Sequence, residues 1–386
     1  MAAQAADSDG DGVLDSADDC PWSAGTSSVD KDGCPDRDGD GTSDFNDVWA
    51  ISNPNYQNEF TTSSSNDYYA VAYSPDGEFI VTGSEDGFVR IWNASTWTNV
   101  RSYNTGTDIF GVDWSADGDY IAATRNDDSI EIYHSSNLTS LHGAISVDVG
   151  SGDQVNAIEF SPDRSTVAAA IGRSGNSGTN GEVTVFDVQI GTELYAVNPN
   201  GEDRFYDLAH SPDGQYIAMA GNGEIYIVNT TSRVTTWTFT NPPAAVNALA
   251  WSPDGNYISM CGGWEGQSAS FDMYQYANGA WGRIWQKTTT TSCASTTFSA
   301  DSSQVISAMY WYQADGNTAR VYESDTGTQI DSFSGPRPGG CTSGNNNQCG
   351  VMYGVAWSPD STHIVTANGR NDCLLYTSPS PRDRVL

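Results

Sequence analysis

The sequence predicts an all-β fold: a β-propeller, built from seven blades of four antiparallel strands each. A turn that reads Ser-Pro-Asp-Gly, or close to it, recurs with spacings of 41, 46, 50, 41, 47 and 59 residues. Apolar and polar residues alternate on both sides of these turns, which is the period of a half-buried strand. A repeat of about 40–50 residues with several short strands is typical of a propeller blade. The turn serines are Ser74, Ser115, Ser161, Ser211, Ser252, Ser299 and Ser358.

The clearest repeat is residues 73–93, YSPDGEFIVTGSEDGFVRIWN. Proline at the second turn position fixes φ, and Asp and Gly favour the tight return of the chain. The alternation predicts strands near 69–73, 78–83, 87–92 and 97–103. The unit resembles a WD repeat, with Asp86 in the turn before the third strand and Trp92 at the end of that strand.

The same two positions recur along roughly 310 residues of the chain. The equivalents of Asp86 are Asp127, Asn180 and Asn222, and those of Trp92 are Tyr133, Phe186, Val228 and Tyr322. The Gly-His dipeptide of the family is absent, because no His in this chain follows a Gly. The resemblance therefore implies an incomplete internal hydrogen-bond tetrad, and membership of the broad WD-like class rather than of one subfamily.

Residues 55–65 precede the first turn and could form the fourth strand of the last blade, which would close the ring and protect its edges. An eighth blade is the alternative, if the natural gene continues beyond this chain. The predicted organisation is a remnant at 1–6, an Asp-rich segment at 7–48, a linker with the ring-closing strand at 49–67, the propeller at 68–372 and a tail at 373–386.

The charge of the chain excludes some classes of partner. Lys and Arg number 16 against 49 Asp and Glu, a formal net charge of −33. Nucleic acid is therefore not expected as a partner, because phosphates bind to basic surfaces. No apolar run approaches the length of a membrane span, so we expect no membrane-spanning segment in this fragment. The first six residues do not read as an intact signal peptide.

The segment at 7–47 carries thirteen Asp in a calcium-loop register. Alternate carboxylates supply the hard oxygens that calcium needs, and a glycine at position 6 permits the sharp turn. A disordered acidic linker is the alternative, although such a linker does not need that glycine twice. Positions 1, 3, 5, 6, 9 and 12 are Asp7, Asp9, Asp11, Gly12, Asp15 and Asp18 in one loop and Asp36, Asp38, Asp40, Gly41, Asp44 and Asp47 in the other; Val13 and Thr42 would give position-7 carbonyls.

Residues 7–48 resemble the thrombospondin type 3 repeat. The resemblance rests on the two loops and on the Cys-Pro pairs that begin at Cys20 and Cys34. It implies an irregular calcium-bound segment with two or more ions, Asp30 and Asp32 as further ligands, and a Cys20–Cys34 disulfide. No helical pattern flanks either loop, so ordinary helix–loop–helix calcium sites are not expected.

The last residues enter the cysteine count. The run CLLYTSPSPRD from Cys373 resembles a translated sequencing adapter, so 373–386 is set aside as an artefactual tail. An even set of six cysteines then remains, which indicates disulfides and an oxidising compartment; free structural thiols are the alternative. Two local pairs suggest themselves: Cys261 with Cys293, expected on one face in adjacent blades, and Cys341 with Cys349, which would close a short loop.

A candidate ligand patch lies in the long loops. In WD-like propellers the second-to-third-strand loops and the inter-blade loops share one face, and the insertions at 172–181, 261–270, 310–318 and 334–350 fall there. Aromatic and Arg side chains on a rigid scaffold are typical of binding surfaces, although they can also simply pack the loops. The patch residues are Trp264, Tyr310, Trp311, Tyr312 and Arg337. Glycosylation triplets at Asn93, Asn137 and Asn229 fall on the opposite face.

The sequence favours binding over catalysis. The four histidines are scattered, and no nucleophile elbow or phosphate loop occurs. We therefore predict a secreted or cell-surface, non-enzymatic protein. Its propeller would bind an extracellular protein or glycan, and its calcium segment would be a stiff spacer. The alternatives are a propeller glycosidase or lyase, with Glu265 and Asp315 as candidate carboxylates, and an envelope structural protein.

Overall fold

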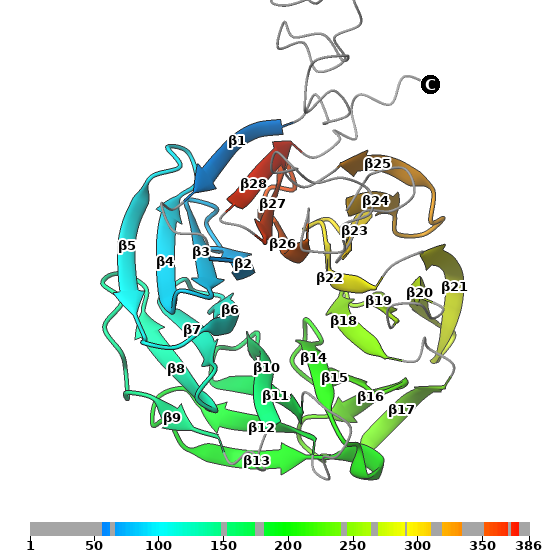
Figure 1. The fold of residues 1–386 in the computed structure, drawn as a ribbon. Helices are drawn as coiled ribbons and strands as arrows, with labels where there is room; N and C mark the ends of the chain where they lie inside the picture. The colour runs from blue at the N-terminus through cyan, green and yellow to red at the C-terminus, as the bar shows by residue number, and fades with distance from the viewer. Residues whose placement is uncertain are drawn as a thin grey trace, which may run out of the picture.

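The computed structural model describes residues 56–61, 66–147, 153–173, 181–240, 245–263, 269–289, 292–309, 319–333, 351–369 and 372–377. These residues form seven four-stranded antiparallel sheets, arranged as blades around a central axis (Figure 1). The expected all-β propeller with four-stranded antiparallel blades is confirmed. Among the described residues, no helix combines the length and apolar character needed to cross a bilayer.

Blades 1 to 4 follow the chain in order, each running from the innermost to the outermost strand. Blade 1 contains β2 (Tyr68–Tyr73), β3 (Phe79–Ser84), β4 (Phe88–Asn93) and β5 (Asn99–Asn104). Blade 2 contains β6 (Ile109–Trp114), β7 (Tyr120–Arg125), β8 (Ser129–His134) and β9 (Ile145–Ser146). Blade 3 contains β10 (Asp153–Phe160), β11 (Thr166–Arg173), β12 (Glu182–Asp187) and β13 (Glu193–Val197). After a short 3₁₀ turn (Pro199–Gly201), blade 4 contains β14 (Phe205–His210), β15 (Tyr216–Gly221), β16 (Glu224–Asn229) and β17 (Thr235–Thr240).

Blades 5 to 7 complete the ring. Blade 5 contains β18 (Val246–Trp251), β19 (Tyr257–Gly262), β20 (Ala269–Ala277) and β21 (Ala280–Thr289). Blade 6 contains β22 (Cys293–Phe298), β23 (Gln304–Met309), β24 (Ala319–Glu323) and β25 (Gln329–Phe333). Blade 7 contains β26 (Met352–Trp357), β27 (His363–Asn368), β28 (Asp372–Thr377) and, as its outer strand, β1 (Tyr56–Thr61).

The ring closes between the two ends of the chain. Strand β1 pairs antiparallel with β28, from Tyr56 opposite Tyr376 to Thr61 opposite Asp372 (Figure 1). The expected ring-closing strand is therefore present. One boundary needs correction: the propeller does not end at 372, because residues 373–377, assigned to the tail, form most of β28. This strand has hydrogen-bonded partners on both sides, β27 and β1, so the last blade cannot be completed without it.

The repeated turn owes its shape to one hydroxyl–carboxylate pair. In all seven turns the serine Oγ donates a hydrogen bond of 2.5–2.7 Å to the Asp two residues later. In blade 1 the same Ser74 Oγ accepts the Phe79 N–H, and Asp76 accepts the Glu78 N–H. A charged acceptor makes such bonds short and strong. The turn serine therefore joins the first two strands of a blade.

The hydrophobic core is divided into seven clusters, one between each pair of neighbouring blades. Between blades 4 and 5, for example, Ile225 and Ile227 pack with Val246, Ile258 and Met260. The other six clusters join the remaining pairs in the same way. Each sheet therefore buries both faces against its neighbours, and a single blade cannot form this core alone.

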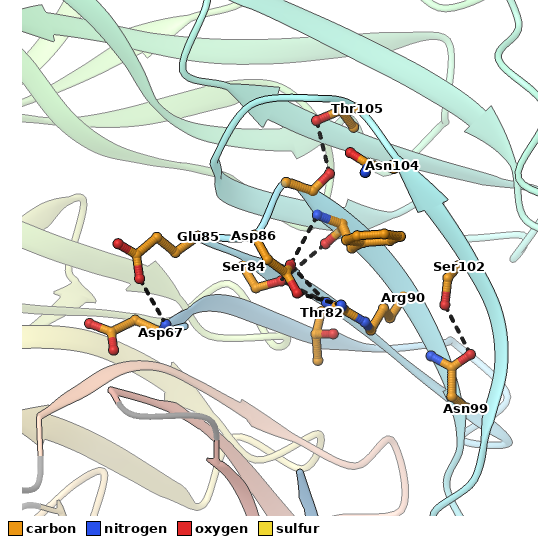
Figure 2. Close-up of polar contacts among 12 residues, drawn as sticks. Asp67, Thr82, Ser84, Glu85, Asp86, Arg90, Asn99, Ser102, Asn104 and Thr105 are labelled. Carbon is orange, nitrogen blue, oxygen red and sulfur yellow. Dashed lines mark hydrogen bonds and ion pairs between the residues drawn. The ribbon is translucent and has the colours of Figure 1, made fainter. Parts of the chain in front are cut away.

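Blade 1 has a polar cluster at its WD-like positions (Figure 2). Arg90 donates to both carboxylate oxygens of Asp86, at 2.9 and 2.5 Å, and to Ser84 Oγ at 2.9 Å. Beside this cluster, the Trp92 indole N–H donates to Thr82 Oγ1 at 2.9 Å. Arg90 therefore supplies the hydrogen bonds to Asp86, in a chain that lacks the Gly-His dipeptide typical of WD repeats.

One of the expected disulfides is present. Cys261 on β19 is bonded to Cys293 on β22, with a Cα–Cα distance of 5.5 Å, and the bond joins blade 5 to blade 6. The other four cysteines expected to pair, Cys20, Cys34, Cys341 and Cys349, lie outside the described residues. The calcium-loop residues at 7–47 lie outside them as well.

Candidate functional site

The ligand patch predicted from the long loops contains five residues. Trp264, Tyr310, Trp311, Tyr312 and Arg337 all lie outside the described residues. The described residues contain another candidate site, at the end of the central channel where the innermost strands begin. This site is formed by the innermost strands themselves.

Each inner strand has a β-bulge near its start. In blade 1 the pairing with β3 shifts between Tyr68 and Ala70, which leaves Tyr69 without a partner across the ladder. The other six inner strands shift at the equivalent place. A bulge redirects a side chain away from strict alternation. The seven bulge residues are Tyr69, Phe110, Asn156, Tyr206, Asn247, Ala294 and Tyr353, and all line one cavity of about 670 Å³ at the channel mouth.

Three consecutive blades place an aromatic side chain there. The ring of Tyr69 meets that of Tyr353 edge-on at a centroid distance of 5.0 Å and that of Phe110 at 5.3 Å. We call Tyr353, Tyr69 and Phe110 the aromatic arc. All three side chains are partly exposed. Since aromatic residues are enriched in the centres of protein interfaces, this arc is the strongest binding feature of the channel mouth.

The other side of the mouth is polar, and its amides join blades. Asn156 donates to the carbonyl of Phe205 in the next blade at 2.7 Å. Asn247 donates to the carbonyls of Gly263 at 3.3 Å and Cys293 at 3.2 Å. Because these amides hold backbone carbonyls, they fix the shape of the mouth on the side opposite the arc.

Acidic groups surround the arc. The Tyr353 hydroxyl donates to Asp67 Oδ2 at 3.0 Å. The Asp67 N–H donates to Glu85 Oε2 at 3.2 Å (Figure 2). Burial, and to a smaller extent the negative charges of Glu85, Asp67 and Asp108, together raise the pKa of Tyr69 to about 12. The aromatic surface is therefore set in a negative field, which favours a partner with basic groups.

Carboxylates on the inner strands of blades 2 to 4 join consecutive inner strands. Asp113 accepts the Phe160 N–H at 2.8 Å, Glu159 accepts the His210 N–H at 2.6 Å, and Asp207 accepts the Leu249 N–H at 2.9 Å. These contacts run from blade 2 to blade 5. They show that the carboxylates have a structural task, since each satisfies an N–H of the next blade.

Two of these carboxylates have perturbed acidity. Burial raises the pKa of Asp207 to about 7, with a smaller contribution from the Glu159 charge. Burial and the same charge hold the pKa of Asp113 well above its usual range. Within the described part of the chain, no group of three His, Cys, Asp or Glu side chains is placed to hold a metal ion. Asp207 lines the mouth cavity, so it is the group there with acid–base capability near neutral pH.

Strand alternation and turn spacing do not predict the aromatic arc, although the sequence contains a signal for it. Each bulge residue stands five positions before the turn serine of its blade, and Tyr or Phe occupies that place in blades 1, 2, 4 and 7. Strict alternation of buried and exposed residues hides this signal. It gives no reason to expect that two adjacent residues, such as Tyr68 and Tyr69, both contribute to packing or binding. Tyr68 is buried between blades, whereas the bulge lets Tyr69 reach the channel.

The comparisons agree with the repeat architecture. The family model described as WD domain, G-beta repeat, matches residues 54–93, 97–134 and 233–267. The chain therefore contains WD40 repeats folded as a β-propeller. The first match covers β1 to β4, so it begins on the outer strand of one blade and ends on the third strand of the next. A search of curated proteins found no match to this chain.

Proposed function

We propose that this chain is a secreted or cell-surface interaction module that docks an extracellular partner on the channel mouth. The observation that supports it most is the aromatic arc, in which bulges of three neighbouring blades bring Tyr353, Tyr69 and Phe110 into contact around an open cavity. The acidic groups beside the arc favour a basic protein segment as the partner. The hydrogen-bonded rim opposite the arc would keep the docking surface preorganised.

We also propose that residues 7–48 bind calcium and act as a stiff spacer before the propeller. The proposal rests on the two Asp loops and their glycines at position 6. Without a cation these carboxylates repel one another, so metal binding and ordering of the segment would be one event. Such a spacer fits a millimolar-calcium environment outside the cell, where affinities of about 0.1–1 mM are sufficient.

A displayed random-peptide library, selected against the immobilised full chain, tests the docking surface. We expect the enriched peptides to be basic and to lose binding to a Phe110→Ser, Tyr353→Ser double variant that melts like the parent protein. A matched control is Tyr195→Ser, an outer-strand tyrosine distant from the channel. Enriched peptides that bind the double variant unchanged would contradict the proposed surface, as would an equal loss in the control.

Calcium titration of the full chain by calorimetry tests the spacer. We expect at least two ions per chain, and weaker binding when Asp9 and Asp38 are changed to Asn. Changing Asp76 and Asp117 of the propeller turns in the same way should leave the stoichiometry unaltered. Absence of saturable binding at millimolar calcium would refute the spacer without bearing on the docking surface.

The alternative of a polysaccharide-cleaving enzyme has one specific observation in its favour. Asp207 has a pKa raised to about 7 by burial and lines the mouth cavity, as a general acid would. The sequence candidates Glu265 and Asp315 lie outside the described residues. Release of reducing ends from acidic and neutral polysaccharides, lost in Asp207→Asn, would favour the enzyme over the interaction module.

A further inference from the structure

Blades 4 and 5 enclose a groove on the face opposite the channel mouth. It lies between the first turn of each blade and the hairpin that joins β20 to β21, and its volume is about 640 Å³. Five aromatic side chains line it: Tyr216, Trp237, Trp251, Tyr276 and Trp281. We call this the blade 4/5 groove.

The groove exists because blade 5 has an unusual outer hairpin. Strands β20 and β21 contain 9 and 10 residues, whereas β4 and β5 of blade 1 contain 6 each. Their two-residue turn, Asn278-Gly279, has positive φ values of 54° and 80°, as a tight hairpin turn requires. The extension projects Tyr276 and Trp281, from either side of that turn, over the turns of blades 4 and 5.

Four of the five aromatic rings form one connected cluster. Trp251 and Trp281 meet edge-on at a centroid distance of 5.5 Å, and Tyr276 lies 5.3 Å from Trp281. Tyr216 stacks with Trp251 at 6.5 Å. Tyr276 is 47% exposed, and the three tryptophans are only partly buried. Large aromatic faces are thus available to a ligand, which a fully packed core would not offer.

The charges at the rim are all negative. Asp213 and Asp254 line the groove, and no Lys or Arg does so among the described residues. Burial alone would raise the pKa of Asp254, but hydrogen bonds from Ser252 and Asn256 outweigh it and lower the pKa. The carboxylate is therefore ionised at neutral pH and adds to the attraction that the π faces exert on a cation.

The protein pairs its own cations with aromatic rings elsewhere. Arg233 lies over the ring of Tyr195 at 4.4 Å, Arg90 over Phe88 at 4.5 Å, and Lys287 lies 5.9 Å from the ring of Trp285. The chain has only 16 Lys and Arg in total. The richest aromatic cluster described is thus the one whose lining supplies no cation of its own.

We propose that the blade 4/5 groove is a binding site for an organic cation, the chemistry shared by quaternary ammonium compounds and by Arg or Lys side chains. Trp251, Trp281 and Tyr276 would supply the aromatic faces, and Asp213 and Asp254 the countercharge. The site is independent of the proposed docking surface, because the turns and hairpins that build it are at the opposite ends of the strands.

Calorimetric titration of the full chain with choline, beside its uncharged carbon isostere 3,3-dimethylbutan-1-ol, tests the proposal. We expect choline to bind several-fold more tightly than the alcohol and more weakly as salt rises. Trp281→Leu and Tyr276→Leu should each weaken choline binding about 2- to 5-fold, the range of an exposed cation–π contact. Asp254→Asn should weaken it as well, because it removes a countercharge. N-acetylarginine amide, titrated in parallel, distinguishes a guanidinium from a quaternary ammonium preference.

The matched controls lie in the equivalent groove between blades 7 and 1. Trp97→Leu and Asp76→Asn change an indole and a turn carboxylate there and should leave choline binding unaltered. Equal affinity for choline and the alcohol would overturn the proposal, as would an equal loss in the controls or no saturable binding of any cation. Binding of a neutral oligosaccharide that displaces choline and is insensitive to salt would also overturn it. Phe110→Ser of the aromatic arc should not change choline binding, so failure of one site is distinguishable from failure of the other.

Discussion

The grooves between blades 4 and 5 and between blades 7 and 1 have the same frame but different linings. Both are framed by two Ser-Pro-Asp turns, at Ser211 and Ser252 in one and at Ser358 and Ser74 in the other. Where the first groove has Tyr216 and Trp251, the second has His363 and Tyr73. The volumes are about 640 and 430 Å³.

The difference arises mainly in the outer hairpin. Blade 1 contributes Ala94, Ser95 and Trp97 from the turn at 94–98 between β4 and β5, whereas blade 5 contributes Tyr276 and Trp281 from extended strands. The repeat therefore supplies a scaffold that is nearly constant from blade to blade. Binding chemistry is added by a local extension that leaves the turn and the core unchanged.

The largest expected effect comes from removing the disulfide that joins blade 5 to blade 6. Changing both Cys261 and Cys293 to Ala should lower the free energy of unfolding by about 3–4 kcal/mol, since the bond closes a loop with a sequence separation of 32 residues. Urea denaturation measures this. Either single variant breaks the same bond and should lose a similar amount. A loss below about 1 kcal/mol would contradict this, because it would mean that the unfolded chain gains little conformational freedom when the bond is removed.

Because the two grooves are framed by the same kind of turn, removing a turn serine should lower the free energy of unfolding equally at either groove. Ser252→Ala and Ser74→Ala each remove a buried hydroxyl that donates to an Asp and accepts a backbone N–H. Each should cost about 1–3 kcal/mol, the penalty for leaving buried polar groups unsatisfied. Denaturation curves that differ strongly between the two variants would show that the turns are not equivalent.

The extended hairpin has a specific weak point. A Cβ on Gly279 would meet no atom within 4 Å, so Gly279→Ala is strained only by its φ of 80° and should cost about 1 kcal/mol. Gly106→Ala, with φ of 83° and equally open surroundings, is the matched control. Both should lower the midpoint of unfolding similarly, but only the first should shift the Trp281 indole resonance. An unchanged resonance in Gly279→Ala would separate the turn from the groove.

The smallest expected effect is on acid stability. Hydrogen bonds from Ser252 and Asn256 lower the pKa of Asp254 against the effect of burial, and those from Ser358 and Thr362 do so for Asp360, which the His363 charge also assists. A folded-state pKa below the unfolded value stabilises the protein above the ordinary Asp pKa, and this is lost as pH falls below about 4. Asp254→Asn and Asp360→Asn should therefore each flatten the loss of stability in acid. Melting temperatures from pH 2.5 to 6 that keep the parent slope would contradict this.

Much of the fold could be predicted because blade strands are local. The four strands expected in blade 1 lie within about two residues of β2 to β5, since alternation and turn chemistry act over a few residues. The repeat also predicted Trp92 and Tyr133 near the ends of third strands, and they lie in β4 and β8. The tail boundary was wrong because β28 is stabilised by pairing with β1, which lies near the other end of the sequence. No pattern of neighbouring residues reveals that pairing.

The sequence by itself determined the repeat, the turns and the closing strand, because hydrogen bonds within a turn and the two-residue period of a strand are encoded by neighbouring residues. Only the tertiary structure decided which side chains meet. Tyr353 and Tyr69 are far apart in sequence and touch because the ring closes, and Trp251 meets Trp281 because a hairpin extends over the neighbouring turns. Contacts of this kind depend on bulges, strand lengths and ring closure, which position residues across blade boundaries that no local pattern can describe.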